Sequence, residues 1–457
     1  MKQQKHYHLI GIGGIGMSAI ARLLLSHGTK VSGSDEKESR ATRELTRLGA
    51  QITIGHSAAT IDSPDQVIYS SAIKEDNPEI REAKKKSIPV IRRAQALADL
   101  MKDKTVIAVT GSHGKTTTAS LVSFLLLEAK LSPTIAVGGI LKNIDSNASF
   151  GEGKFLVAEA DESDGSFLCY HPHYSIITNI DYEHLDYYKT FENELAAFRE
   201  FIHTTDRNGC LFCCNDDQNI KMLLQGYTGS VIRFGLHKDA DIYPQQIIFK
   251  GLSSEFDCIY KGTSLGRFLL ALGGLHNISN ALSAIALGLE LGIDLKVIRH
   301  ALQFYQGTLR RLEVKFQDAT GAIIDDYAHH PTEIKATLAA AKEMGYRRII
   351  AVFEPHRYTR THLLLEEFAK SFHDAEYVVV TDIYAASELP IEGVSGACLC
   401  DAIKKQSTHG QVEFIPKAGL VKRILEIFKP GDLVITLGAG DITKVCDELV
   451  QAYTRKS

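Results

Sequence analysis

The feature that most restricts the fold is a short glycine loop between a β-branched stretch and an apolar helix. Residues 105–109 (TVIAV) favour a buried strand, residues 110–116 (TGSHGKT) form the loop, and residues 116–129 are typical of a helix. In such a unit, backbone N–H groups of the loop and of the helix N-terminus can cradle phosphate oxygens. Lys115 and Thr116 then stand where a lysine contacts phosphate and a threonine hydroxyl contacts Mg²⁺. The loop is shorter than the common pattern, so a chance Gly-Lys-Thr at a helix start is the alternative.

A second glycine loop, residues 11–16 (GIGGIG), also follows an apolar run and opens a helix. Its glycines let the backbone approach a pyrophosphate, and Asp35 follows the next apolar run, where an acidic side chain can reach a ribose hydroxyl. On its own this loop indicates NAD binding or a purely structural turn. Together the two loops predict two nucleotides, one per domain. A simple dehydrogenase needs only the first loop, and a simple ATPase needs only the second.

The chain divides into three stretches, which its 457 residues accommodate. Residues 1–100 and 310–457 each alternate short apolar runs with helical patterns, as βαβ units do. Between them, residues 101–309 begin with the phosphate loop. The apolar runs are 7–10, 30–33, 67–70, 90–91, 322–324, 348–353, 377–381 and 433–437, and residues 332–344 are typical of an amphipathic helix. We expect an α/β fold with mostly parallel sheets.

Composition excludes several classes of protein. Lys and Arg number 51 against 55 Asp and Glu, so a protein whose main partner is nucleic acid is not expected. The basic residues 84–86, with Arg92 and Arg93, are interpreted as a solvated helix face. Neither a signal peptide nor a membrane-length apolar run is visible, so we predict a cytoplasmic protein. Eight cysteines are too sparse for a disulfide scaffold, and the C-x-x-C spacing in residues 210–214 is interpreted as buried strand cysteines.

Acidic residues follow the next apolar run, residues 155–158. Glu159 stands at its end, well placed as a metal ligand beside the phosphate loop, whereas Asp161, Glu162 and Asp164 crowd the same turn and are in part solvated or local caps. His184 follows the apolar run 175–178 among further acids, and it is a candidate for a second metal or for phosphate.

With these features in order, the chain resembles the Mur ligase family along essentially its whole length. The resemblance rests on GIGGIGMSAIA (11–21), SD (34–35), SSAI (70–73), TGSHGKTTT (110–118), VAEADESD (157–164), TNIDYEH (178–184), HNISNA (276–281), DDYAHHPTE (325–333), EPHRYTRT (354–361) and GAGDI (438–442). It implies a Rossmann-like N-terminal domain over 1–100 for a UDP-sugar, a P-loop-type ATPase domain over 101–309, and a Rossmann-like domain over 310–457 for an amino acid. Ser112 and Ala328 depart from the commoner Thr and Gly, and the segment near His184 varies more.

The reaction that the resemblance implies is ATP-dependent ligation of L-alanine to the lactyl carboxylate of UDP-N-acetylmuramate, through an acyl phosphate, in peptidoglycan synthesis. ATP and Mg²⁺, with two ions expected, are the implied cofactors. The implied ATP-binding residues are Gly111, Ser112, His113, Gly114, Lys115, Thr116, Thr117, Asn277, Arg310 and Asp326. The implied UDP-sugar residues are Gly13, Gly14, Ile15, Gly16, Ser34, Asp35, Ser70 and Ser71. The implied alanine residues are Tyr327, His329, His356, Arg357 and Arg360. Thr116, Glu159 and His184 are the implied metal ligands, and Lys115, Glu159, His184 and His329 the implied catalytic residues.

Other functions stay open at this point. A sibling ligase that attaches a recycled murein tripeptide to the same sugar shares most of these motifs. A nicotinamide-dependent oxidoreductase would use only residues 11–16, and a non-enzymatic ATP-binding protein would use only residues 110–116. For Asn277, helix capping is the alternative to adenine contact, and for Arg357 and Arg360 two surface arginines are the alternative to an alanine carboxylate site. We expect a monomer or homodimer, with neither nucleic acid nor membrane insertion.

Overall fold

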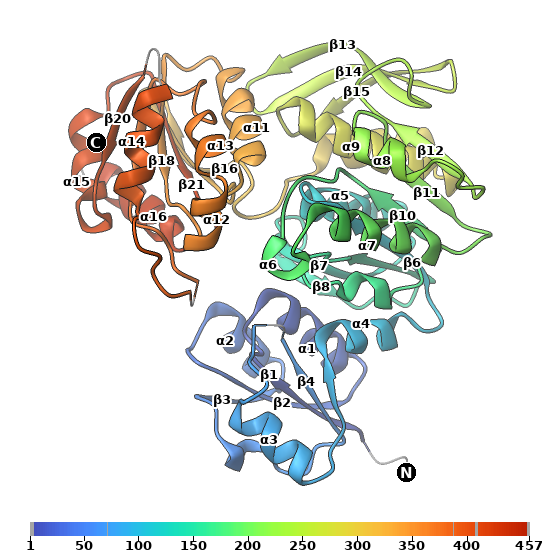
Figure 1. The fold of residues 1–457 in the computed structure, drawn as a ribbon. Coiled ribbons are helices and arrows are strands. Elements are labelled where there is room, and N and C mark those ends of the chain that lie inside the picture. The colour runs from blue at the N-terminus through green and yellow to red at the C-terminus, as the bar shows by residue number, and fades with distance from the viewer. Residues whose placement is uncertain (1–3, 71, 387, 407–409, 455–457) are drawn as a thin grey trace. The chain divides into compact units, whose positions relative to one another are not determined.

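The N-terminal part of this computed structural model is a five-stranded parallel sheet of order β3-β2-β1-β4-β5 (Figure 1). The structure describes residues 4–70, 72–386, 388–406 and 410–454. Helices cover both faces of this sheet, and α3 packs Ile80 and Ala83 onto Ile10 and Val67. The elements are β1 (His6–Ile10), α1 (Ile15–Ser26), β2 (Lys30–Asp35), α2 (Arg40–Arg47), β3 (Gln51–Ile54), β4 (Gln66–Tyr69), α3 (Pro78–Lys85), β5 (Val90–Arg92) and α4 (Arg93–Met101).

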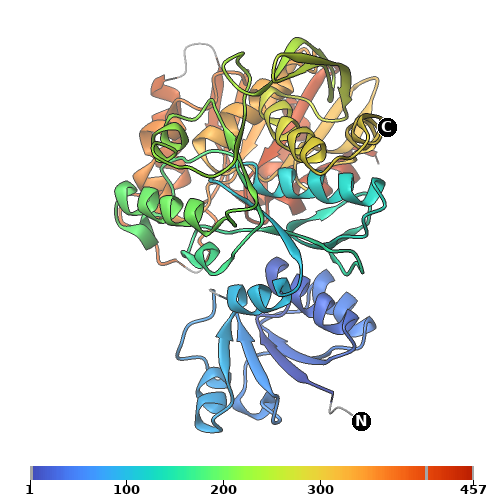
Figure 2. The same ribbon diagram turned by 90° about the vertical axis from the view of Figure 1, so that its right-hand side faces the viewer.

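The middle of the chain forms a ten-stranded sheet of order β15-β14-β13-β12-β11-β10-β6-β9-β7-β8. Helix α5 packs on β6, β7 and β9, and residues 117–126 are all buried, as an apolar helix enclosed on every side requires (Figure 2). The elements are β6 (Thr105–Thr110), α5 (Lys115–Glu128), β7 (Thr134–Leu141), β8 (Ser146–Ser149), β9 (Phe155–Glu159), β10 (Tyr174–Ile177), α6 (Leu185–Tyr188), α7 (Phe191–Thr204), β11 (Cys210–Cys214), α8 (Gln218–Leu223), β12 (Val231–Phe234), β13 (Ile242–Lys250), β14 (Ser253–Tyr260), β15 (Thr263–Leu270), α9 (Leu275–Glu290) and α10 (Leu295–Phe304).

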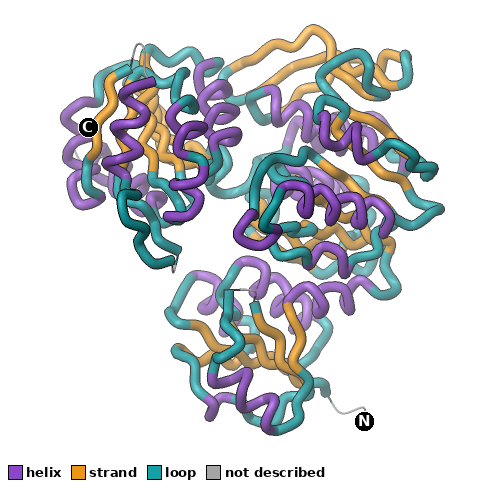
Figure 3. The backbone as a smooth tube through the Cα atoms, in the orientation of Figure 1, coloured by secondary structure: helices purple, strands orange, loops and turns teal. Residues whose placement is uncertain are grey.

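The C-terminal part is a six-stranded sheet of order β16-β17-β21-β18-β19-β20, in which β16 alone runs antiparallel to its neighbour (Figure 3). Two separate apolar clusters cover its two faces, one with α11, α13 and α14 and the other with α15 and α16. The elements are β16 (Glu313–Asp318), β17 (Gly321–Asp326), α11 (Pro331–Lys342), β18 (Arg348–Phe353), α12 (Tyr358–Leu363), α13 (Leu365–Ala369), β19 (Tyr377–Val380), α14 (Gly396–Gln406), β20 (Gln411–Phe414), α15 (Leu420–Ile427), β21 (Asp432–Leu437) and α16 (Ile442–Thr454).

The predicted α/β class with mostly parallel sheets is therefore confirmed. Packing divides the chain into two compact units. One comprises Met1–Gln245, Asp257–Phe268 and Ser279–Gln306, and the other comprises Gln246–Phe256, Leu269–Ile278 and Gly307–Ser457. The domain limits expected at residues 100 and 309 stay a prediction. Among the described residues, every helix falls short of the length and apolar character that crossing a membrane needs.

Candidate active site

The phosphate loop lies between β6 and α5 in the first compact unit, and its glycines are required by its shape. Gly111 has φ +126° and Gly114 has φ +82°, a backbone region that side-chain-bearing residues rarely adopt. A Cβ on Gly111 would collide with Thr178, and one on Gly114 would lie 2.8 Å from Asn280 Oδ1. The loop backbone therefore adopts positive φ angles and approaches Thr178 and Asn280 more closely than a residue with a Cβ would allow.

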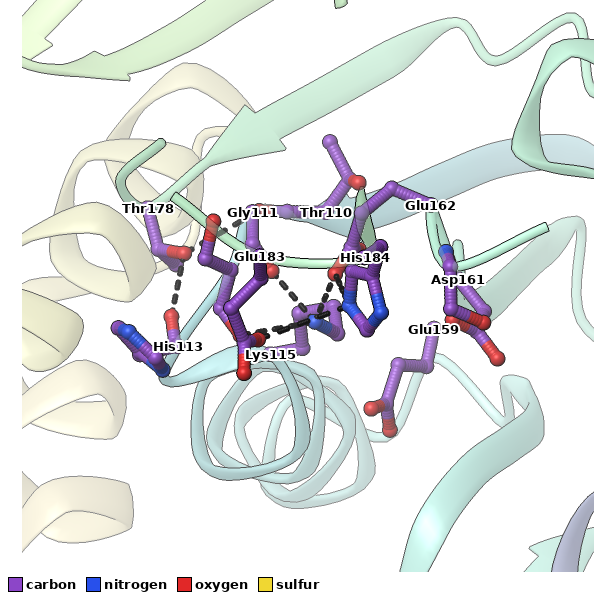
Figure 4. Close-up of polar contacts among 12 residues, drawn as sticks. Thr110, Gly111, His113, Lys115, Glu159, Asp161, Glu162, Thr178, Glu183 and His184 are labelled. Atoms are coloured by element: carbon purple, nitrogen blue, oxygen red, sulfur yellow. Dashed lines mark hydrogen bonds and ion pairs between the residues drawn. The ribbon is translucent and has the colours of Figure 1, made fainter. Parts of the chain in front are cut away.

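The end of β10 fixes this loop from the side. Asn179 receives a hydrogen bond from the His113 N–H at 2.9 Å and donates one to the His113 carbonyl at 3.0 Å, and Thr178 Oγ1 donates to the same carbonyl at 2.6 Å (Figure 4). The Ser112 hydroxyl accepts the Asp181 N–H at 2.8 Å, and the His113 ring contacts the Asp181 carboxylate at 3.0 Å. The loop is thus fixed by residues at the end of β10, which belong to the quoted segment 178–184 but were not predicted as individual site residues.

Lys115, at the first position of α5, contacts both its own loop and an acidic turn. Its Nζ donates to the carbonyls of Gly111 at 2.5 Å and Ser112 at 3.0 Å, and to Glu162 Oε1 at 2.7 Å (Figure 4). Burial opposes the charge on Lys115, but Glu162 and Asp161 outweigh it and raise the lysine pKa. The ammonium is therefore fully charged at the mouth of the loop, where phosphate oxygens need a cation.

Glu159 ends β9 beside the loop, as predicted. Its carboxylate accepts the Thr116 hydroxyl at 2.9 and 3.1 Å and the Gly138 N–H at 2.6 Å. Burial raises the pKa of Glu159, against the opposite influence of Lys115. Threonine and carboxylate oxygens are ligands that Mg²⁺ prefers, so Thr116 and Glu159 fit a magnesium ion.

His184 lies on the other side of Glu162 with φ +55°. Its Nε2 is 3.3 Å from Glu162 and 3.5 Å from Glu183 (Figure 4). Burial opposes protonation, but these two carboxylates raise the histidine pKa. Mg²⁺ prefers oxygen ligands and a histidine beside two carboxylates can carry a positive charge, so both the metal role and the phosphate role of His184 stay predictions. Glu162 is fully buried and joins Lys115 to His184, a stronger role than the sequence indicated.

The loop predicted for the UDP-sugar is tied to the end of β2. The N–H groups of Gly11 and Ile12 donate to the Ser34 carbonyl at 2.9 and 3.0 Å, and the Gly13 N–H donates to Asp35 at 2.8 Å. Gly14 is the N-cap of α1, so Ile15 and Gly16 form its first turn. Ser70 lies after β4 and accepts the Ala72 N–H, and Ser71 lies outside the described residues.

A buried carboxylate that the sequence did not reveal accepts a hydrogen bond from Ser34. Glu79, in α3, is fully buried and accepts hydrogen bonds from Ser34 at 2.5 Å, from His56 at 3.2 Å and from Thr60. Burial opposes its charge, but hydrogen bonds from His8, Ser34 and Thr60 lower its pKa to about 2.

Arg93 corrects the expectation of a uniformly solvated basic face. Residues 84–86 and Arg92 are exposed, as expected. The Arg93 side chain is only 18% exposed, and its Nη2 donates to Asp161 at 3.2 Å. The sequence of a basic run cannot show which of its side chains forms an ion pair with an acidic residue far along the chain.

Three residues predicted for ATP lie in the second compact unit. Asn277 is buried in the first turn of α9 and donates to the Gly273 carbonyl at 2.8 Å, which also fits helix capping. Arg310 donates to Asp325 at 3.2 Å and to the Gly438 carbonyl at 2.6 Å. Asp326 accepts the N–H groups of Leu312 and Ala328, and burial raises its pKa to about 6. These contacts leave their ATP roles as predictions.

The residues predicted for alanine gather after β17 and β18 of the second compact unit. The rings of Tyr327 and His329 are 5.2 Å apart, those of His329 and His356 are 5.6 Å apart, and Arg360 Nη1 is 3.3 Å from His356 Nδ1. Arg357 is the N-cap of α12 with φ +69°. Burial, with the charges of His329 and Arg360, lowers the pKa of His356 to about 3. The two arginines give the cluster positive charge, which suits an amino-acid carboxylate, and its role in binding alanine stays a prediction.

Tyr384 joins this cluster without having been predicted, because its ring stacks on His356 at 5.6 Å. Elsewhere, the cysteines of residues 210–214 are buried in β11, as the sequence indicated.

Family models cover most of the chain. Residues 6–105 match the model described as Mur ligase family, catalytic domain, residues 109–288 match the Mur ligase middle domain, and residues 310–440 match the Mur ligase, glutamate ligase domain.

Relatives match along the full length. A UDP-N-acetylmuramate–L-alanine ligase of Anaeromyxobacter dehalogenans is 46% identical, with 99% of each chain covered. One of Syntrophus aciditrophicus is 45% identical, with 97% of this chain and 92% of the relative covered. Among solved structures, the UDP-N-acetylmuramate–alanine ligase of Thermotoga maritima has a TM-score of 0.86 at 33% identity, with 100% of both chains covered. A murein peptide ligase of Psychrobacter arcticus, with a TM-score of 0.71 at 23% identity and 98% of both chains covered, shares the fold. The chain belongs to the Mur ligase family.

Proposed function

We propose that the protein joins L-alanine to the lactyl carboxylate of UDP-N-acetylmuramate at the expense of ATP, giving UDP-N-acetylmuramoyl-L-alanine, ADP and phosphate. The full-length similarity to ligases of this name, at 45% and 46% identity, supports the substrates. The observation that carries the chemistry is Lys115, held charged between the phosphate loop and the buried Glu162.

The chemistry requires an activated carboxylate, because a free carboxylate is a poor acyl electrophile. A carboxylate oxygen attacks the γ-phosphorus, the bond to the β-bridging oxygen breaks, and ADP leaves. The neutral alanine nitrogen then attacks the acyl carbon to form a tetrahedral species, which loses the extra proton on nitrogen to water and expels phosphate, leaving the amide. A free α-amine has a pKa of about 8, so a useful neutral fraction exists near neutral pH without a strong base.

Residues of the first compact unit perform the phosphate chemistry. Lys115 and the loop N–H groups hold the β- and γ-phosphates, and His184, whose protonated form Glu162 and Glu183 favour, adds a positive charge toward the transferred group. Thr116 and Glu159 would hold Mg²⁺, which neutralises charge on the phosphates. A second Mg²⁺ is part of the proposal, and His184 is the candidate to assist it as an alternative to contacting the transferred phosphoryl group.

The other roles follow the predicted sets. Residues 13–16 with Ser34, Asp35 and Ser70 hold the UDP-sugar. Asn277, Arg310 and Asp326 complete the nucleotide site. Tyr327, His329, His356, Arg357 and Arg360 bind alanine. A three-domain division at about residues 100 and 309, a monomer or homodimer, and a cytoplasmic location complete the proposal.

Phosphate release tests the function. Phosphate should appear only when ATP, Mg²⁺, UDP-N-acetylmuramate and L-alanine are all present. A competition between L-alanine and the tripeptide L-Ala–γ-D-Glu–diaminopimelate separates this ligase from its sibling. Preferential use of the tripeptide would assign the chain to the sibling reaction instead, and turnover of a nicotinamide cofactor would overturn the class.

A further inference from the structure

The Arg93 guanidinium lies between the first turn of α1 and the acidic turn that follows β9. Arg93 is the first residue of α4, and one edge of its guanidinium donates to Asp161 at 3.2 Å. Its Nη1 lies so close to Gly16 that a Cβ on that glycine would be 2.7 Å away. The absence of a side chain at residue 16 therefore makes room for Arg93.

Gly16 and Asp161 belong to different sites. Gly16 is in the first turn of α1, whose N-terminus presents unpaired N–H groups and the positive end of the helix dipole to an anion. Asp161 lies between Glu159, which ends β9 and contacts Thr116, and Glu162, which contacts Lys115 as Figure 4 shows.

Asp161 links Arg93 to the residues beside the phosphate loop. It accepts a hydrogen bond from Arg93 at 3.2 Å, and the next residue, Glu162, accepts one from Lys115 at 2.7 Å. The Asp161 side chain also accepts the Ser163 N–H at 3.1 Å, which fixes the turn. A change in the position of Asp161 therefore reaches Lys115 through the neighbouring Glu162.

Arginine suits a bridging role because its planar fork carries five donors. One edge can bind a carboxylate while the other binds phosphate oxygens. The ammonium of lysine is a point charge and cannot fix two anions in one plane.

We propose that Arg93 is a positioning residue that couples the two nucleotide sites, so that UDP-N-acetylmuramate and ATP each tighten the binding of the other. The diphosphate at the N-terminus of α1 orders the guanidinium. The ordered guanidinium then holds Asp161 and the acidic turn in the arrangement that receives ATP and Mg²⁺. The inference rests on the proposed function, because it requires both nucleotides.

Calorimetric titration measures this coupling. The dissociation constant of β,γ-imido-ATP with Mg²⁺ is determined with and without saturating UDP-N-acetylmuramate. The wild-type protein should show at least about fivefold tightening, and linkage requires the same factor in the reciprocal titration. In Arg93→Ala and Arg93→Lys the factor should fall below about twofold, with intrinsic binding of the ATP analogue much less changed.

A matched control separates this effect from general domain docking. Arg40, in α2, donates to both oxygens of Asp145 at 2.8 and 2.9 Å, so this ion pair, like that of Arg93 with Asp161, joins residues far apart along the chain. Arg40→Ala removes this ion pair and should keep the wild-type coupling factor.

The outcomes are distinct. Undiminished coupling in both Arg93 variants, equal loss in Arg40→Ala, or no coupling in a wild-type protein that binds both nucleotides would each overturn the inference. A wild-type protein that does not bind UDP-N-acetylmuramate would instead overturn the proposed function. If Arg93→Ala melts early, Asp161→Asn, which removes the partner charge, must show the same loss of coupling.

Discussion

Glu194 makes a sharp prediction about stability, because it is a carboxyl group in a place that disfavours its charge. The residue is in the first turn of α7 and is fully buried. Among the described residues, neither of its oxygens receives a side-chain hydrogen bond. Burial, with the nearby charge of Glu162 and against that of His184, raises its pKa from 4.5 to about 8.

The sign follows from proton binding. The unfolded chain releases the Glu194 proton near pH 4.5, whereas the folded chain keeps it up to about pH 8. Between these values the unfolded state binds fewer protons, so stability falls as pH rises. Each pH unit in this window costs about 1.4 kcal/mol, which gives a penalty below about 1 kcal/mol at pH 5 and about 3 kcal/mol at pH 7.

Glu194→Gln removes this penalty while keeping the shape of the side chain. The free energy of unfolding of the variant minus that of the wild type should therefore increase by about 2 kcal/mol from about pH 5 to pH 7. Urea unfolding of the full chain at closely spaced pH values measures the difference through the transition midpoint. Glu192→Gln is the matched control, because Glu192 is exposed in the same helical turn, and it should show no such trend. A Glu194→Gln effect that is constant with pH would refute the reasoning.

Three further predictions concern the proposed chemistry. Lys115→Ala should lower turnover by about 100-fold or more, measured as phosphate release, because a cation at the phosphates is lost; turnover near wild type would contradict the assignment. Arg357→Ala should raise KM for L-alanine far more than KM for ATP, whereas Arg347→Ala, an exposed change in the same C-terminal unit, should alter neither. Equal effects on both KM values would remove Arg357 from the alanine site. Gly111→Ala should abolish binding of β,γ-imido-ATP in a titration while the chain remains folded, because the added Cβ displaces the strand end at Thr178; unchanged affinity would show that the loop shape is not needed.

The glycine loops were predictable because their local sequence carries the reason for their shape. A β-branched run, glycines at positive φ and a following helix are all properties of neighbouring residues. Glu159 was found for the same reason, since the end of an apolar run marks the end of a strand. The parallel strands β17, β18, β19 and β21 of the C-terminal sheet were recognised as continuous apolar runs, which burial on both faces requires, whereas β20, which is half exposed, was not.

The remaining features depend on which distant side chains meet. Strand β3 was not expected, because Gln51–Ile54 is largely exposed and lacks a long apolar run. Glu79 lies in a charged helix, and only folding shows that it meets Ser34 and His56. Tyr384 follows a strand of ordinary appearance, and its stacking on His356 has no local signal.

The acidic turn around Lys115 places several carboxylates beside the proposed phosphate site. Asp161 and Glu162 raise the pKa of Lys115, so the lysine stays protonated although it is buried. The carboxylates of Asp161 and Glu162 would repel ATP. The single positive charge of Lys115 cannot neutralise these two carboxylates and a triphosphate as well. Among the described residues, Arg93 contacts Asp161 and His184 contacts Glu162, so Arg93 and the protonated form of His184 can offset part of this surplus. Cations that merely balanced ATP would hold substrate and product equally well. Cations that are already paired with carboxylates bind the substrate ATP only modestly. They can bind more strongly to the negative charge that develops during phosphoryl transfer. Stronger binding of the transition state than of the substrate is what accelerates a reaction.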